Sequence, residues 1–174
     1  ISREHYLGVR IGRELGVYAG MMNPVFGIRV PDHSAYLRSK TLLNQNDQSH
    51  GLLLHYERES WQSDLHFLAG NLLQATPLRQ RGIAGKIETD WGKDSRWGVS
   101  GLFTTNEYRS RNLGAIHARL GFGHGSAFLG QLGVIREAPP GSTPQIGGYW
   151  FGQYSLAVAR VLNLTATTEF YTAD

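Results

Sequence analysis

The sequence predicts an all-β protein, an antiparallel transmembrane β-barrel of about ten strands. Segments of about ten residues alternate apolar residues with polar or small ones, which is the length and period of a membrane-spanning β-strand. The connections alternate between short and long, as they do on the two sides of an outer-membrane barrel. Aromatic residues lie near both ends of these segments, where a bilayer has its interfaces.

The composition fits one domain, residues 1–174. Charged residues make up 18% of the chain, below the roughly 25% that is usual for soluble domains. There is no cysteine, so disulfide scaffolds and thiolate metal sites are excluded. The net charge of +3 is spread along the chain and does not predict a nucleic-acid partner. The 22 glycines suit the close packing of a barrel wall.

Residues 82–91 show the strand pattern most clearly. Ile83, Ile87 and Trp91 fall on one face of an extended chain, and the opposite face carries Lys86, Glu88 and Asp90. A helix would scatter these three charges around its circumference, whereas a strand puts them in one row. The next four residues, Gly-Lys-Asp-Ser, have the composition of a tight turn.

The same alternation predicts the other nine strands. Four of them place leucine on the apolar face: 7–11, 15–21, 52–57 and 65–69. The other five each carry an aromatic residue there: 97–104, 116–122, 128–134, 150–158 and 162–170. Aromatic and branched residues favour strands, which supports these assignments.

The connections set the expected orientation. Short turns are predicted at 13–14, 58–63, 92–95, 123–126 and 159–161, and longer connections at 23–50, 73–81, 105–111 and 138–147. In bacterial barrels the short turns are periplasmic and the long loops extracellular. Both ends of the sequence would then be extracellular, so we expect a segment of a larger barrel, with a closed ten-stranded barrel as the alternative.

The polar face of the strands supplies the candidate pore-lining residues. They are Arg10, His55, Glu57, His66, Lys86, Glu88, Asp90, His117, Arg119 and Glu169. Inward charges hydrate a pore and set its ion preference. The alternative is that these residues pair with one another across strands and only fill a polar interior.

The connection 23–50 is the second candidate site, because a loop of this length is commonly functional. It carries Arg29, Asp32, His33, Arg38 and Lys40. We expect either a constriction that folds into the pore or an ordinary ordered outer loop.

A family resemblance appears at the start of this connection. Ala-Gly-Met-Met-Asn-Pro-Val-Phe-Gly at 19–27 resembles the Gly-x-x-x-x-Pro-Phe-Gly segment of phosphate-selective and related porins, with the proline displaced by one position. The hairpin 51–71 resembles the next hairpin of that family. The resemblance implies porin-like architecture. The basic ladder that phosphate selectivity implies is missing, because Lys86 is flanked by Glu88 and Asp90.

No motif predicts an enzyme, a cofactor or a metal site. The seven histidines show no His-x-x-x-His spacing, and Gly-x-Ser-x-Gly is absent. His55 and His66 could face each other across a hairpin, which leaves a paired-histidine site as an alternative. Gly121-Phe-Gly-His-Gly is predicted to be a tight turn.

The sequence therefore predicts a porin-like channel of the Gram-negative outer membrane, for passive diffusion of small polar or ionic solutes. The expected partners are the lipid bilayer with its lipopolysaccharide, the solutes, and either further copies of the chain or other envelope proteins. One alternative is a structural barrel that anchors an envelope complex, with its lumen plugged or occupied. Another is a soluble β-sandwich, which shares the alternation.

Overall fold

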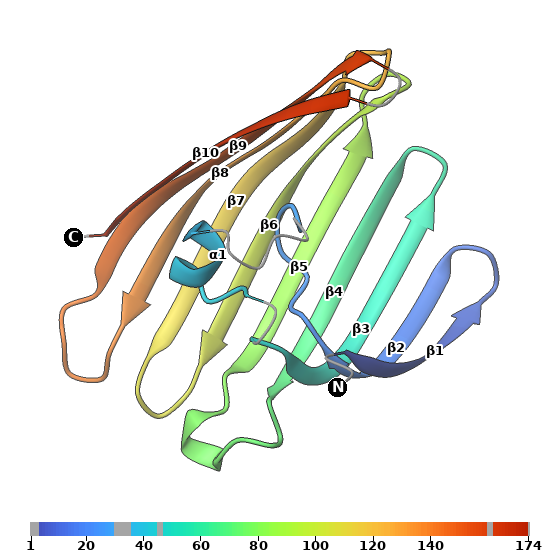
Figure 1. Cartoon of the computed structure of the whole chain (residues 1–174). Helices are drawn as coiled ribbons and strands as arrows, with labels where there is room; N and C mark the ends of the chain where they lie inside the picture. Colours follow the sequence, from blue (N-terminus) through green and yellow to red (C-terminus); the bar gives the residue numbers. More distant parts are fainter. Residues whose placement is uncertain (1–3, 30–35, 45–46, 160–161, 174) are drawn as a thin grey trace.

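The computed structural model describes residues 4–29, 36–44, 47–159 and 162–173. They form one ten-stranded sheet in which each strand pairs with its neighbour in the chain, and every pairing is antiparallel (Figure 1). The strands are β1 (His5–Ile11), β2 (Leu15–Met22), β3 (Ser49–Arg58), β4 (Trp61–Gly70), β5 (Arg81–Asp90), β6 (Ser95–Thr105), β7 (Ser110–Gly121), β8 (Ala127–Ala138), β9 (Gln145–Ala159) and β10 (Leu162–Ala173). The prediction of an all-β protein with ten antiparallel strands is confirmed.

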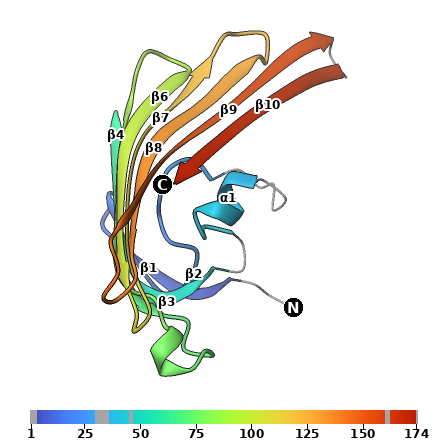
Figure 2. The ribbon, with the colours of Figure 1, turned by 90° about the vertical axis from the view of Figure 1, so that its left-hand side faces the viewer.

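The sheet is curved but not closed into a barrel. It bends around a hollow, with β1 at one edge and β10 at the other (Figure 2). These two strands are not paired with each other in the part of the chain that the structure describes. The described strands also belong to a single sheet, so this part of the protein is not a two-layer sandwich.

The connections agree with the predicted pattern at one end of the sheet more than at the other. Short turns join strands at 12–14, 59–60, 91–94 and 122–126. At the opposite end, 23–48 and 71–80 are long, but the connection 106–109 has only four residues. The prediction of a long connection at 105–111 was wrong, because β6 and β7 continue their pairing to Thr105 and Ser110.

The two faces of the sheet differ as the alternation predicts. The convex face exposes large apolar side chains, among them Leu7, Ile87, Val99, Ile116, Leu132, Val134 and Leu164. Tyr6 lies opposite Gly20, and its ring packs on Tyr18, with 5.9 Å between the ring centroids. Tyr6 therefore lies on the concave face.

The core lies between the concave face and the connection 23–48. Helix α1 (Tyr36–Lys40) and residues 23–29 lie inside the hollow (Figures 1 and 2). Phe26 and Leu37 of this connection pack with buried side chains of the sheet: Leu68, Ala84, Leu102, Leu113, Ala115, Ile135, Tyr149 and Phe151. No helix in the described part of the chain is long and apolar enough to cross a membrane.

Candidate functional site

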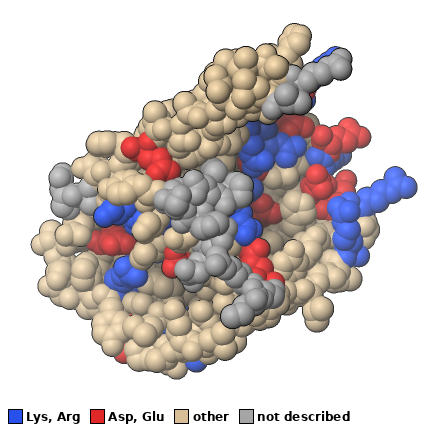
Figure 3. Space-filling view, viewed as in Figure 1, with Lys and Arg blue, Asp and Glu red and all other residues tan. Residues whose placement is uncertain are grey.

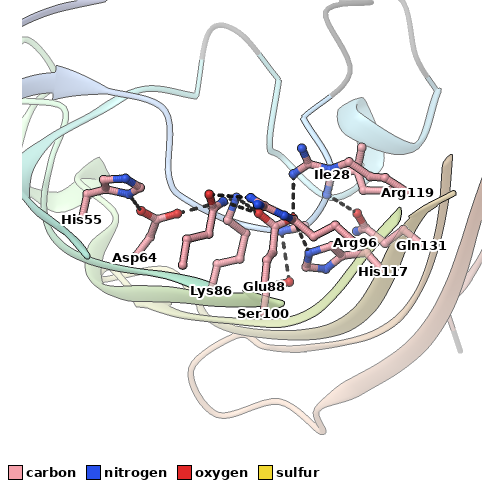
Figure 4. A network of polar contacts seen from close by, with 12 residues as sticks. Ile28, His55, Asp64, Lys86, Glu88, Arg96, Ser100, His117, Arg119 and Gln131 are labelled. Atoms are coloured by element: carbon pink, nitrogen blue, oxygen red, sulfur yellow. Dashed lines mark hydrogen bonds and ion pairs between the residues drawn. The ribbon is translucent and has the colours of Figure 1, made fainter. Parts of the chain in front are cut away.

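A network of charged side chains occupies the half of the concave face next to the short turns. Acidic and basic side chains adjoin one another on the right of Figure 3, and Figure 4 shows the contacts that join them. The pairing of the strands aligns the residues. His55 lies opposite Asp64, which lies opposite Lys86, so three strands place ionisable side chains at one level.

Glu88 is the centre of the network. Its Oε1 lies 2.6 Å from a terminal nitrogen of Arg119 and 3.0 Å from Nε2 of His117, and its Oε2 lies 3.0 Å from Nζ of Lys86. Its side chain is fully buried. A buried carboxylate needs such partners, because an isolated one would be very unfavourable.

Gly98 makes the contact between Glu88 and His117 possible. Glu88 on β5 and His117 on β7 both lie opposite Gly98 on β6, so they are separated by one strand. A Cβ atom at Gly98 would lie 2.7 Å from Cγ of Glu88 and 2.9 Å from Nε2 of His117. The missing side chain therefore lets two side chains meet across an intervening strand.

A second branch of the network runs toward β1. Lys86 Nζ lies 3.6 Å from Asp64 as well as 3.0 Å from Glu88, so it joins the two branches. Nδ1 of His55 lies 2.6 Å from Asp64, and its Nε2 lies 3.7 Å from Glu57. Arg10 lies 3.7 Å from the same oxygen of Glu57. The chain of contacts thus extends from β1 to β7.

Three members of the network were missed by the sequence analysis. Arg96 donates to Asp90 at 2.7 Å and to Gln62 at 2.8 Å, Gln62 donates to Glu88, and Asp64 binds His55. Gln62 lies in a predicted turn, and Asp64 and Arg96 each come just before a predicted strand. Gln62 and Asp64 alternate in step with His66, and Arg96 lies on the same face of its strand as Ser100. Longer predicted strands would therefore have included all three residues.

The network is electrically balanced and becomes more exposed toward its ends. Among the described residues it joins four cationic side chains, Arg10, Lys86, Arg96 and Arg119, to four carboxylates, Glu57, Asp64, Glu88 and Asp90. Side-chain exposure is 0% at Glu88, 42% at Arg119 and 62% at Arg10. Such a surface is wet and polar at its edges without favouring one sign of charge.

Two predicted pore-lining residues lie outside the network. His66 is fully buried, and its ring lies against Gly51, where a Cβ would be 2.8 Å from Nε2. It pairs with Leu53 while His55 pairs with Asp64, so the alternative of a His55–His66 pair was wrong. Glu169 accepts a hydrogen bond from the backbone of Leu37 at 3.2 Å, so it holds α1.

The connection 23–48 is fixed to the sheet by polar side chains. Gly27 donates its backbone N–H to Ser100 at 3.0 Å, and Ile28 donates to Gln131 at 2.7 Å (Figure 4). Arg111 donates to the carbonyl of Thr41. Gly27 has a φ of +54°, and a side chain there would overlap the amide of Gln131. Ser100, Gln131 and Arg111 were not among the predicted site residues.

The predicted loop residues have local partners. Arg29 lies 3.0 Å from Glu4, Arg38 donates to the carbonyl of Leu43, and Nζ of Lys40 lies 5.4 Å from the ring centroid of Tyr36. Asp32 and His33 lie outside the described residues. Burial raises the pKa of Glu4, but hydrogen bonds from Asn23 and Arg29 outweigh it, so the pKa lies below its usual value.

A cavity of about 240 Å³ separates part of the connection from the sheet. Phe26, Leu37, Lys86 and Phe151 are among its lining residues. No group of histidine and acidic residues suited to a metal ion occurs in the described part of the chain. Comparisons with protein-family models, curated proteins and solved structures gave no match.

Proposed function

We propose that the protein forms part or all of the wall of a porin-like channel in an outer membrane, through which small polar or ionic solutes diffuse passively. The observation that carries the proposal is the difference between the two faces of the sheet. One face exposes apolar side chains along most of each strand, and the other carries a continuous charged network. A transmembrane barrel wall requires this arrangement.

The placement of charge on the convex face supports the orientation toward lipid. The arginines of this face lie close to strand ends: Arg58 ends β3, Arg81 begins β5, and Arg136 is two residues before the end of β8. A charged side chain is costly at the centre of a bilayer and much less so at its interface. Trp91 and Phe122, in the short turns, are exposed and suit an interfacial belt.

The charged network would line the water-filled side of the channel. Its four cationic and four anionic side chains predict weak selectivity between cations and anions. The connection 23–48 would narrow the channel, since it packs against the concave face inside the hollow. The resemblance to phosphate-selective porins remains a prediction, because no comparison bears on it.

The test is the conductance of the purified protein in planar lipid bilayers. We expect stepwise conductance with a reversal potential near zero in a salt gradient. Replacing Arg10 and Arg119 by glutamine should shift the reversal potential toward cation preference, because both are at least 42% exposed on the proposed lumen face. Arg136→Gln, on the convex face, is the matched control. A wild-type protein that inserts but never conducts would contradict the channel.

One observation favours a second function, a plugged barrel that anchors an envelope complex. Phe26 and Leu37 are buried against the sheet, so the connection fills part of the hollow. Under this reading the wild-type protein is silent, and a variant that loosens the connection, such as Phe26→Ala, conducts. If the wild type and Phe26→Ala both conduct, and to the same extent, the plug is excluded.

A further inference from the structure

A second cavity, of about 250 Å³, lies at the end of the sheet with the long connections. Its walls come from the residues before β3, the end of β6, and the connection between β4 and β5, which includes the short 3-10 helix η1 (Thr76–Leu78). None of the charged residues around Glu88 is among its lining residues. Leu68, Leu78 and Leu102 provide apolar wall, and Gln48, Gln80 and Thr104 provide polar groups.

The polar groups of this cavity have buried atoms without a hydrogen-bond partner among the residues that the structure describes. They are both amide atoms of Gln80, Nε2 of Gln48 and Oγ1 of Thr104. Gln48 is 8% exposed and Thr104 is 7% exposed. Buried polar atoms are nearly always hydrogen-bonded, because leaving one unpaired is unfavourable. Four such atoms around one cavity point to a bound molecule that supplies their partners.

Three ionised groups line the same cavity; Arg111 and Asp47 already have partners, and Arg109 is partly exposed to water. Nε of Arg111 donates to Glu137 at 2.6 Å, and Arg111 also donates to the carbonyl of Thr41. Asp47 accepts a hydrogen bond from the backbone of Asn44 at 2.8 Å. The unsatisfied groups are amides and a hydroxyl, which both donate and accept. Their complement is therefore a neutral molecule with hydroxyl groups, in preference to an anion.

We propose that this cavity binds a neutral polyhydroxylated solute, with the size of a single sugar residue. Hydroxyl groups would pair with Gln48, Gln80 and Thr104, and the C–H face of the ring would lie on the leucines. The volume is slightly below that of pockets for drug-sized ligands and suits one small ring. This site goes beyond the channel, since binding does not require conductance.

Saturation-transfer NMR on the whole protein in detergent tests the proposal, with D-glucose and myo-inositol as probes. We expect transfer to at least one of them. Gln80→Met and Thr104→Val keep the size of the side chain and remove the polar groups, so each should weaken binding at least tenfold. Gln145→Met and Thr105→Val, at exposed positions on β9 and β6, are the matched controls and should bind as the wild type does.

Folding is measured separately, by unfolding in urea. Because Gln80→Met and Thr104→Val remove unpartnered buried groups, both variants should unfold at the same urea concentration as the wild type or higher. Weakened binding with intact stability then supports the site. Absence of transfer to both probes would overturn it, as would binding that both variants retain. Phosphate binding alone, detected by phosphorus NMR, would also overturn it in favour of an anion site.

Discussion

The two halves of the concave face are built from the same strands but are stabilised in opposite ways. Next to the short turns, charged side chains from β1 to β7 bind one another and remain partly exposed. Next to the long connections, apolar side chains are covered by the connection 23–48. The comparison shows that one sheet face can be charged and partly exposed at one end and mainly apolar and covered at the other.

The difference arises from which residues occupy the inward positions. On β5, Ala84 lies in the covered half while Lys86 and Glu88 lie in the charged half. On β7, Leu113 and Ala115 are followed by His117 and Arg119 in the same way. The change from apolar to charged occurs within one pair of inward positions on both strands.

The largest effect is expected from Glu88→Gln. The substitution leaves Lys86, His117 and Arg119 beside a neutral group in a buried site. Removing one partner of a buried ion pair costs about 3–5 kcal/mol, and we expect this loss in the free energy of unfolding measured in urea. Glu57→Gln is the control in the same network, because Glu57 is 52% exposed. Glu57→Gln should lower the free energy of unfolding by less than about 1 kcal/mol. Equal losses in the two variants would refute the central role of Glu88.

The covered half is tested by Phe26→Ala. Phe26 is 8% exposed, and removing a buried phenyl ring costs about 3 kcal/mol or more. We expect the connection to detach while the charged half stays intact, so chymotrypsin should cleave at Tyr36 faster in the variant than in the wild type. Leu7→Ala, at an 83% exposed position on the convex face, should leave the cleavage rate unchanged. An unaltered rate in Phe26→Ala would show that the polar anchors alone hold the connection.

Gly98→Ala should have a smaller effect on the charged half. Its methyl group would overlap the carbonyl of Ile87 and press against Glu88 and His117. Such overpacking costs about 1–3 kcal/mol of unfolding free energy. Gly101→Ala is a matched control on the same strand, because its Cβ would lie 3.7 Å from Phe103, an ordinary contact. Equal stability of the two variants would mean that the strands shift without cost.

Gly27→Ala applies the same reasoning to the covered half. The residue adopts a left-handed backbone conformation, and a side chain would meet Gln131. We expect a loss of about 1 kcal/mol from backbone strain, plus faster cleavage of the connection. The charged half should keep its contacts, so the ion selectivity of the proposed channel should match that of the wild type. A change in selectivity without faster cleavage would contradict this separation of the two halves.

The smallest effect is the pH dependence contributed by Glu4, whose pKa in the folded state lies below its ordinary value of 4.5. The stabilisation from Glu4 is therefore complete well above pH 4.5 and is lost as the pH falls through the lower folded-state pKa. At pH 7 we expect the free energy of unfolding of the wild type to exceed that of Glu4→Gln by less than about 1 kcal/mol. At pH 2 we expect no measurable difference between the two. A difference in unfolding free energy that grows as the pH falls would contradict the downward shift of the Glu4 pKa.

The sequence predicted the strands because period-two alternation is local, and it predicted the inward face of β5 residue by residue. Glu88, Lys86 and His117 lie on the face that the alternation predicts. Their contacts could not be predicted, since they depend on strand alignment and on the absence of a side chain at Gly98. The contact that Glu169 makes could not be predicted for a related reason. Its partner, the backbone of Leu37, lies 132 positions away in the sequence.

The opening at Gly98 has a consequence for how the sheet assembles. If β6 slid by one residue against β5, Trp97 or Val99 would enter the space in which Glu88 and His117 meet, and Gly98 would turn toward the apolar face. In the misaligned hairpin the carboxylate of Glu88 would then lie beneath a bulky side chain. A one-residue slip of β6 is therefore unfavourable, because Gly98 is the residue that leaves room for Glu88 and His117 to meet.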